Sequence, residues 1–332
     1  MAAVDRAPNM TDVASRAGVS HQTVWRVLNG SAVVRQTTRE RVLAAVEELG
    51  YRRNLSARHL VTKRSMAIGV LGPATAHFGP TSSMYAVEHA VRGAGYHALL
   101  VSAEPDESRS ALDGLLDQSV EALVVIAPYQ STLRAIEEVR AGVPIVVLQA
   151  GAASIGISVA VDQAAGVRAV VDHLVGLGHT RIQHIGGPRD FTDARLRADA
   201  FGRHMKRRGL PALPELYGDW SPESGYRAAQ QLDGTAATAV FCANDQMALG
   251  AVHAFVEGGR AVPGDVSVVG FDDTPESGHM LPPLTTVHQD FEAVGRRAVR
   301  ALLEQLGGLE PKKSALIKPR LVIRASTAAP RN

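Results

Sequence analysis

The chain of 332 residues contains a single cysteine and no long hydrophobic run. One cysteine excludes an internal disulfide and is typical of a reducing compartment. No apolar stretch reaches the roughly 20 residues that span a bilayer, so we expect no membrane partner. The first residues, Met-Ala-Ala-Val-Asp-Arg, contain no apolar signal-peptide core. These absences predict a cytoplasmic protein.

Motifs for common catalytic chemistries are missing as well. No Gly-x-Gly-x-x-Gly opens a helix after a strand, no Walker loop is present, and no serine stands in a nucleophile-elbow context. The histidines lack the spacing of metal ligands. Cys242 lies in the apolar run Ala239–Ala243, where a core residue is a better interpretation than a nucleophile. The sequence therefore predicts no enzyme, no cofactor and no metal site.

The charge is unevenly distributed along the chain, although the formal net charge is only +2. Residues 1–64 contain 11 Lys and Arg against 5 Asp and Glu, whereas the remainder contains 24 against 28. A basic N-terminal part on a mildly acidic remainder is typical of a DNA-binding module joined to a ligand-sensing domain.

The segment Thr11–Asn29 has the pattern of two short helices joined by a tight turn. Gly18 supplies the left-handed backbone of a sharp turn, and Ser20 suits the N-cap of the second helix. Small and apolar residues at helical spacing give each helix one buried face. The pattern favours a helix–turn–helix over an ordinary helical hairpin. Its second helix presents polar side chains near the N-terminus, where a recognition helix meets DNA: His21, Gln22, Thr23 and Arg26.

A third helix is expected to complete this small N-terminal domain. Thr37 and Glu40 have the spacing of a capping box, and Gly50 follows the last residue of an apolar stripe. The next segment, 51–61, has helical potential but too little apolar surface to fold alone. Its order should therefore depend on a partner.

From Met66 onward, short apolar runs alternate with amphipathic helices. Buried parallel strands covered by helices give this alternation. About ten strand candidates over roughly 260 residues favour two doubly wound lobes, with a ligand cleft at the carboxyl ends of the strands. The predicted strands are Met66–Leu71, His97–Ser102, Ala122–Ala127, Pro144–Leu148, Ile182–Gly186, Ala239–Ala243 and Val266–Phe271, and the predicted helices include Met84–Ala94, Ala164–Leu177 and Asp245–Glu257.

Several longer motifs carry a resemblance to a known family. They are residues 12–30 around the helix–turn–helix, Gly218-Asp-Trp-Ser221, Ala243-Asn-Asp-Gln-Met-Ala-Leu-Gly250, Ser267-Val-Val-Gly-Phe-Asp-Asp-Thr274 and Pro282-Pro-Leu-Thr-Thr-Val-His-Gln-Asp-Phe291. With these motifs the chain resembles the lactose-repressor family of bacterial transcription regulators, from about Met10 to Ser326. The resemblance implies a dimer that grips palindromic operator DNA and a periplasmic-binding-protein-like body.

The resemblance also implies the fold class and the domain boundaries. We expect an α/β protein with an N-terminal three-helix head and a two-lobed body of two doubly wound parallel sheets. The predicted domains are a DNA-binding head at 1–53, a hinge helix and linker at 54–65, and an effector-binding and dimerisation domain at 66–332, whose lobes are about 66–161 with 291–324 and about 162–290.

In the head, the resemblance assigns base reading to His21 and Gln22, and Gln22 suits a bidentate contact with adenine. Arg26 is placed for a guanine or a phosphate, and Leu60 for an apolar wedge in the minor groove. Trp25 departs from the family's small serine, and both DNA sugars and the third helix are open as its contacts. The full predicted DNA-binding set is Ser20, His21, Gln22, Thr23, Arg26, Asn29, Tyr51, Asn54 and Leu60.

In the body, the resemblance places a sugar effector between the lobes. Arg197, Asn244 and Asp272 suit neighbouring hydroxyls, and Trp220 offers a flat apolar face to a pyranose ring. Simpler interpretations remain open at this point: a solvated arginine, a helix-capping asparagine or aspartate, and an edge-packing tryptophan. The predicted effector-binding set is His77, Phe78, Gln149, Arg197, Trp220, Asn244, Asp272, Gln289 and Phe291.

Two departures from the family pattern affect the expected ligand and assembly. Gln149 stands where the family's namesake has a ligand-binding aspartate, which weakens a strict galactoside assignment. Only six residues follow Ser326, without the leucine-heptad tail that makes tetramers, so we expect a homodimer.

The sequence thus predicts a repressor of a carbohydrate-utilisation operon, released from its operator by a small sugar, a galactoside or related glycoside. A purine- or phosphosugar-responsive regulator of the same family is the alternative. A periplasmic-type sugar-binding protein and an enzyme are remote alternatives. The sequence leaves the exact sugar, the operator and the direction of the response open.

Overall fold

The computed structural model describes residues 8–28, 30–31, 33–51, 64–139, 141–152, 154–232, 234 and 236–331. The chain divides into two compact units, residues 1–65 and 66–332, which we call the head and the body and describe separately. Within the described ranges, no helix is both long and apolar enough to cross a membrane.

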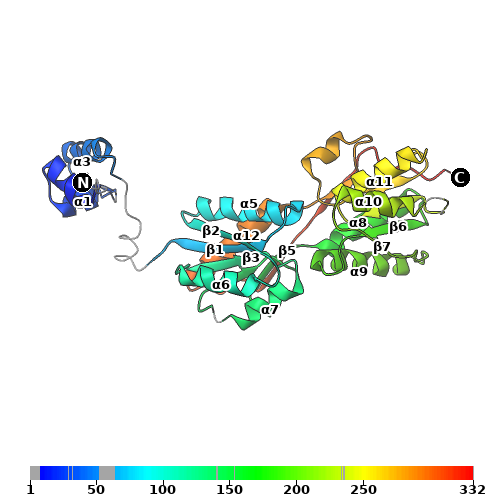
Figure 1. The fold of residues 1–332 in the computed structure, drawn as a ribbon, viewed down its shortest axis with the longest axis horizontal. Helices are drawn as coiled ribbons and strands as arrows, with labels where there is room; N and C mark the ends of the chain where they lie inside the picture. Colours follow the sequence, from blue (N-terminus) through cyan, green and yellow to red (C-terminus); the bar gives the residue numbers. More distant parts are fainter. Residues whose placement is uncertain are drawn as a thin grey trace, which may run out of the picture. The chain divides into compact units, whose positions relative to one another are not determined.

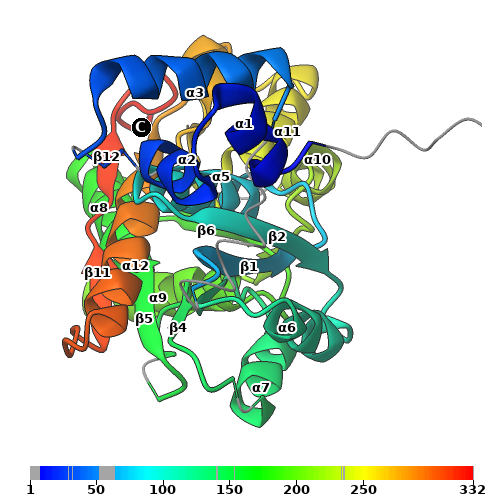
Figure 2. The same cartoon turned by 90° about the vertical axis from the view of Figure 1, so that its left-hand side faces the viewer.

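In the part of the head that the structure describes, three helices pack around one small apolar core, and Figure 2 shows them as α1 (Met10–Ala17), α2 (His21–Leu28) and α3 (Gln36–Glu48). α1 ends at Ala17, and the next residue, Gly18, has a φ of 62°, the left-handed conformation that the tight turn was predicted to need. The hydroxyl of Ser20 accepts a hydrogen bond from the Thr23 amide at 3.2 Å, which confirms the predicted cap of α2.

The starts of two head helices differ from expectation. α1 begins with an unpredicted capping box, in which Asn9 and Asp12 exchange side-chain and backbone hydrogen bonds. The capping box predicted at Thr37 and Glu40 is wrong, because α3 already begins at Gln36 and has no side-chain cap. Glu40 therefore lies one turn inside the helix, where its carboxylate accepts a hydrogen bond from the side-chain nitrogen of Gln36 at 3.0 Å.

The first lobe of the body is a six-stranded parallel sheet of order β11-β5-β4-β3-β1-β2. Helices α5 and α12 cover one face, and α6 and α7 cover the other (Figure 1). The continuous apolar run that predicted β1 is buried along its whole length. The elements are β1 (Ala67–Pro73), α5 (Phe78–Gly93), β2 (His97–Ala103), α6 (Ser108–Asp117), β3 (Ala122–Val125), α7 (Gln130–Glu138), β4 (Ile145–Val147), β5 (Ile157–Val161), α12 (Phe291–Leu306) and β11 (Ser314–Ile317).

The second lobe is a four-stranded parallel sheet of order β7-β6-β8-β9. Helices α10 and α11 pack on one face, and α8 and α9 pack on the other (Figure 1). Its elements are α8 (Gln163–Gly176), β6 (Ile182–Gly186), α9 (Thr192–Arg207), β7 (Leu216–Tyr217), α10 (Pro222–Gln230), β8 (Ala239–Cys242), α11 (Asp245–Glu257), β9 (Ser267–Val269) and the 3₁₀ turn η1 (Pro275–His279).

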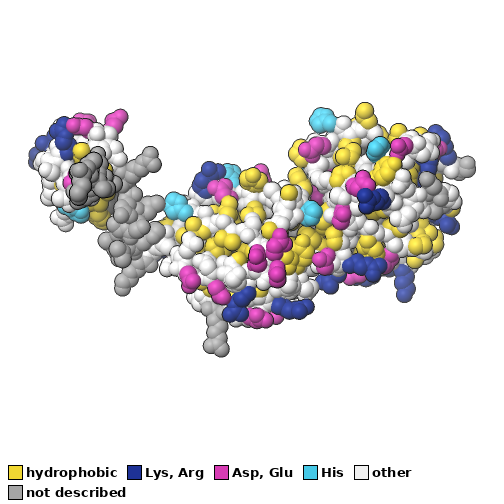
Figure 3. All heavy atoms as spheres, viewed as in Figure 1, with side chains coloured by type: hydrophobic (Ala, Val, Ile, Leu, Met, Phe, Trp, Pro, Cys, Tyr) yellow, Lys and Arg dark blue, Asp and Glu magenta, His cyan; other side chains and the backbone are white. Residues whose placement is uncertain are grey.

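The chain passes between the lobes three times. It enters the second lobe after β5, returns through β10 (Thr286–His288) to α12, and crosses again through β12 (Arg320–Val322). β10 and β12 pair antiparallel, and Ser326 of the tail accepts a hydrogen bond from Val268 at 2.9 Å. The predicted two doubly wound parallel sheets are therefore present. Acidic and basic side chains are interspersed on the face of the body shown in Figure 3.

Candidate functional site

The outer face of α2 presents the polar side chains that the sequence assigned to DNA. His21, Gln22 and Arg26 are exposed, whereas Val24 and Val27 are buried in the head core. The amphipathic pattern thus places donors and acceptors on the outer face of a helix held by three-helix packing. This is the arrangement that major-groove reading requires.

The remaining head residues occupy different environments. Ser20 and Thr23 join their hydroxyls at 2.9 Å at the start of α2, and Tyr51 is buried in the head core with 8% of its surface exposed. Trp25 keeps 46% of its surface exposed on the helix whose outer face carries His21. The predicted contacts Asn29, Asn54 and Leu60 lie outside the described residues.

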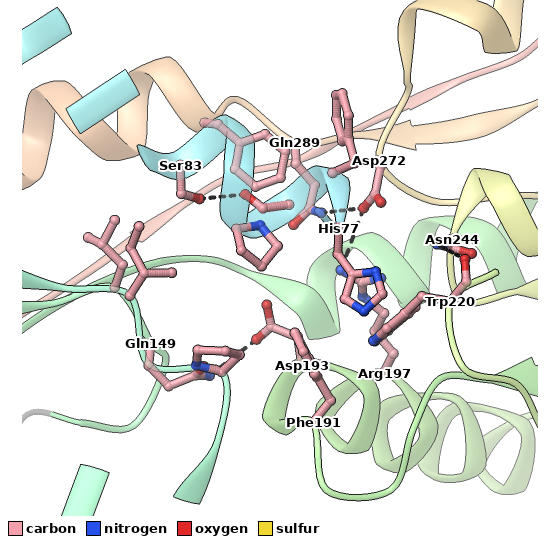
Figure 4. Close-up of a pocket in the computed structure, with 17 residues that line it drawn as sticks. His77, Ser83, Gln149, Phe191, Asp193, Arg197, Trp220, Asn244, Asp272 and Gln289 are labelled. Carbon is pink, nitrogen blue, oxygen red and sulfur yellow. Dashed lines mark hydrogen bonds and ion pairs between the residues drawn. The ribbon is translucent and has the colours of Figure 1, made fainter. Parts of the chain in front are cut away.

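All nine predicted effector residues line a single cavity of the body (Figure 4). The cavity encloses about 80 Å³ of solvent-accessible space. Asn244 follows β8, Asp272 lies beyond β9, and Gln289 follows β10, so polar groups gather beyond the carboxyl ends of strands. The first lobe contributes Gln149 and an apolar wall. That wall contains Phe78, Pro80, Ile126, Leu148 and Phe291.

Arg197 is the cation of this cavity, and it is buried with 4% of its surface exposed. Its Nε donates to the side-chain oxygen of Gln163 at 2.9 Å, and its Nη1 donates to the carbonyl of Ala243. Its Nη2 stands 3.7 Å from a carboxylate oxygen of Asp272. The guanidinium carbon lies 4.0 Å above the ring of Phe271. These contacts overturn the alternative of a solvated charge and fix a donor group at one end of the cavity.

Asp272 is the carboxylate that faces this arginine. Burial raises its pKa to about 7, and nearby Asp245 and Asp193 act in the same direction, against Arg197 and a 2.6 Å hydrogen bond from Gln289. Its backbone φ is 114°, a conformation that side chains other than glycine rarely adopt. A strained, buried carboxyl with a shifted pKa is typical of a functional site.

Trp220 forms a second strained element of the cavity, with a backbone φ of 74°. Its ring lies against the backbone of Gly187, where an added Cβ would stand 2.3 Å from ring atom Cη2. Phe191 meets its ring edge-on with centroids 5.3 Å apart. The indole Nε1 is buried and has no hydrogen-bond partner among the described residues. Trp220 therefore lines the cavity and carries a buried N–H group, so it is not only the edge-packing residue considered as an alternative.

Asn244 both caps a helix and lines the cavity, two roles that were alternatives for it in the sequence. Its side-chain oxygen accepts a hydrogen bond from the Met247 amide at 2.9 Å, which caps α11. Its side-chain nitrogen donates to the carbonyl of Trp220 at 3.0 Å. The helix cap therefore holds an amide at the cavity wall and ties it to the strained tryptophan.

Polar contacts join the two lobes across the cavity. Gln149 of the first lobe donates to a carboxylate oxygen of Asp193 at 3.1 Å. The backbone amide of Thr192 donates to the carbonyl of Pro128 at 2.8 Å. Because each contact has one partner in each lobe, these contacts stabilise the arrangement of the lobes seen here.

Asp193 and Phe191 also line the cavity, although they were not predicted from the sequence. Asp193 precedes Arg197 by four residues, so both lie on the same face of α9, and this spacing was a usable signal. Gln163 was not predicted either. Its side-chain nitrogen donates to a carboxylate oxygen of Asp193 at 3.3 Å and to the side-chain oxygen of Gln289 at 3.0 Å.

Comparison with protein-family models gives two matches. Residues 9–54 match the model described as bacterial regulatory proteins, lacI family, and residues 171–327 match a periplasmic binding protein-like domain. The first match covers the head helices, and the second covers most of the second lobe together with α12 and the tail.

Known proteins resemble the chain over nearly its whole length. The lactose operon repressor of Escherichia coli (strain K12) is 37% identical over 325 residues, which cover 96% of this chain and 90% of that protein. A crystal structure of the Lac repressor dimer bound to operator and the anti-inducer ONPF gives a TM-score of 0.90 at 36% identity, covering 98% of this chain and 100% of that chain. A CelR–cellobiose complex gives a TM-score of 0.70 at 29% identity and covers 96% and 99%.

Proposed function

The chain belongs to the lacI family of bacterial regulatory proteins, and from this premise we propose that it is an operator-binding repressor controlled by a small sugar held between its lobes. Family membership confirms the predicted regulator of transcription and excludes the enzyme considered as an alternative. The sugar, the homodimer and the cytoplasmic location are parts of the proposal.

The observation that carries the effector part is the composition of the body cavity. Arg197, Asp272 and Gln289 present hydrogen-bonding groups at one end, beside the indole of Trp220. Hydroxyl groups of a sugar need such donors and acceptors, and the C–H face of a pyranose packs on an aromatic ring. The CelR–cellobiose complex shows a sugar bound to a protein of the same fold, which supports this class of ligand.

The head part of the proposal rests on the exposed face of α2. His21 and Gln22 read base edges, Arg26 contacts a guanine or phosphate, and Ser20, Thr23, Asn29 and Tyr51 fix the register on the backbone. Leu60 wedges into the minor groove when two hinge segments, including Asn54, order together on a palindromic operator. Replacement of Leu60 by alanine should therefore weaken specific operator binding.

Gating follows from the position of the cavity between the lobes. In a dimer, a ligand that changes the angle between the lobes also changes how the two bodies position their hinge segments, residues 54–65. Such coupling is typically about 1–3 kcal/mol and acts equally on sugar and operator affinity.

The experiment that tests the ligand class is a thermal-unfolding panel of mono- and disaccharides with hypoxanthine and guanine included. A ligand that binds only the folded protein raises the apparent melting temperature. We expect a sugar, with a galactoside or related glycoside first, to do so. Stabilisation by a purine alone would overturn the sugar and favour the purine-responsive alternative.

Arg197→Ala is the matched variant for this panel, because it removes the donors without touching the head. The stabilising sugar should lose its effect on Arg197→Ala. An undiminished shift would show that the sugar binds elsewhere.

A further inference from the structure

The effector cavity contains more acidic than basic groups. Among the described residues that line it are two carboxyl groups, those of Asp193 and Asp272, and one guanidinium, that of Arg197. Burial lowers the pKa of His77, which also lines the cavity, so its imidazole adds no positive charge at pH 7. When both carboxyl groups are ionised, they outnumber the cation by one.

Arg197 already contacts Asp272 and other groups of the protein. Its Nη2 stands 3.7 Å from the carboxylate of Asp272. Its Nε and Nη1 donate to the side-chain oxygen of Gln163 and to the carbonyl of Ala243. The positive charge of this arginine is therefore balanced by Asp272 at one end of the cavity.

Asp193 has only neutral hydrogen-bond partners in the structure. Its two oxygens accept hydrogen bonds from the side-chain nitrogens of Gln149 at 3.1 Å and Gln163 at 3.3 Å. Within the described ranges, no ion pair of 4.0 Å or less includes Asp193, because Arg197 on the same helix contacts Asp272 instead. Neutral amides hold a carboxylate in place but do not cancel its charge. Figure 4 shows this carboxylate directed into the cavity.

Two amide side chains connect the two carboxyl groups. The nitrogen of Gln163 that reaches Asp193 also donates to the side-chain oxygen of Gln289 at 3.0 Å, and Gln289 donates to Asp272 at 2.6 Å. Burial raises the pKa of Asp272, and the negative charge of Asp193 adds to this rise. A positive group bound beside these carboxyl groups would therefore stabilise their ionised forms.

Aromatic side chains from both lobes line the same cavity. Phe78 and Phe291 of the first lobe meet edge-on with centroids 6.0 Å apart, and Phe191 and Trp220 of the second lobe meet in the same way at 5.3 Å. Aromatic faces attract cations through their π electrons and also pack against the C–H face of a sugar. The cavity thus combines a carboxylate that lacks a cationic partner with walls that suit a cationic sugar.

We propose that the effector is an amino sugar whose protonated amine pairs with the carboxylate of Asp193. This inference rests on the proposed function, because it keeps the sugar in the same cavity and adds the charge of the ligand. The hydroxyl groups of the sugar face Arg197, Asp272 and Gln289. The same carboxylate disfavours a phosphosugar, because it repels a phosphate group.

Titration calorimetry on the full chain compares each amino sugar with its neutral counterpart, below the pKa of the amine. The probes are galactosamine and 6-amino-6-deoxygalactose against galactose, and the same pairs in the glucose series. In at least one pair, the amino sugar should bind roughly ten- to hundredfold more tightly, the range expected for a hydrogen bond between charged groups. N-acetylgalactosamine and N-acetylglucosamine keep the nitrogen without its charge and should show no such gain.

Asp193→Asn removes the negative charge and keeps an oxygen that accepts from Gln149. This variant should bind the amino sugar and its neutral counterpart with nearly equal affinity, and its binding of the neutral sugar shows that the cavity is intact. Asp199→Asn is the matched control, because it removes the same charge from an exposed position of α9 outside the cavity. It should keep the full preference for the amine.

The possible failures of this proposal and of the proposed function are distinct. Neutral sugars that bind as tightly as all their amino counterparts would overturn the amino sugar and leave the sugar-controlled repressor standing. A preference for the amine that survives in Asp193→Asn would overturn the role of Asp193. Binding of none of these sugars, neutral or amino, would overturn both the inference and the sugar effector.

Discussion

At the scale of single residues, two buried carboxyls stand out, Asp272 in the wall of the effector cavity and Asp245 close to it. Asp272 and Asp245 both have raised pKa values, about 7 and about 6, and burial is the main cause in each case. Asp245 is held by hydrogen bonds from the Thr274 amide at 2.9 Å and from the hydroxyls of Ser277 and Thr286 at 2.5 Å. It therefore fixes the segment that follows the strained Asp272.

The pKa of Asp272 makes stability depend on pH. A carboxyl whose pKa is raised on folding favours the folded state below its unfolded pKa of 3.8, and this contribution is lost as pH rises through about 7. The free energy of unfolding of the parent chain, measured with denaturant, should therefore fall more steeply between pH 4 and 7 than that of Asp272→Asn. The difference should approach about 1.4 kcal/mol per pH unit. Parallel curves for the two proteins would contradict a raised pKa.

Trp25 is the residue of the recognition helix that departs most from the family. With 46% of its surface exposed, it has apolar area available to DNA. We expect Trp25→Ser to weaken operator binding about tenfold in fluorescence anisotropy, because it removes this apolar area from the helix. The opposite outcome, lower stability with full operator affinity, would assign Trp25 to packing within the head.

At the scale of elements, close helix contacts depend on glycine. A Cβ at Gly250 of α11 would stand 1.8 Å from the carbonyl oxygen of Pro222, which begins α10. Gly250→Ala should therefore lower the free energy of unfolding by about 3 kcal/mol. Gly114 of α6 has nothing within 4 Å of its Cβ position, so Gly114→Ala should instead stabilise the protein by about 0.5–1 kcal/mol. Equal effects in urea unfolding would refute this packing.

Elements with strong periodic patterns could be predicted from the sequence, whereas their first turns could not. The apolar run Ala239–Ala243 predicts β8 to within a residue, because a parallel strand that is buried on both faces consists of consecutive apolar residues. Thr37 and Glu40 satisfied the capping-box spacing and still lie inside α3. Spacing alone cannot place a helix start, since helix ends fray and their position varies by one or two residues.

At the scale of the whole body, the lobes meet through groups that are distant in sequence. The predicted cavity residues were found because their motifs resemble those of a family. The Gln149–Asp193 hydrogen bond has no such signal, since its two partners come from different lobes and meet only in the folded body. The strained φ of Asp272 likewise depends on the tertiary environment and leaves no trace in composition.

The hydrogen bond between Gln149 and Asp193 gives a prediction about how the lobes are held together. Gln149→Asp places a second carboxylate against Asp193, and the repulsion should open the cleft and lower the melting temperature. Adding Asp193→Ser should restore both properties, while Gln149→Asn serves as the uncharged control. Small-angle scattering of the unliganded proteins measures the opening. An unchanged profile for Gln149→Asp would show that this pair does not hold the lobes together.

The central claim is that a sugar bound at Arg197 and Asp272 controls operator binding by the head. The most direct measurement is the operator affinity of the full chain, by fluorescence anisotropy, with and without the sugar that stabilises it. We predict a roughly 5- to 150-fold weaker affinity with sugar in the parent chain and no change in Arg197→Ala. A sugar that binds the cavity yet leaves operator affinity unchanged would contradict the account.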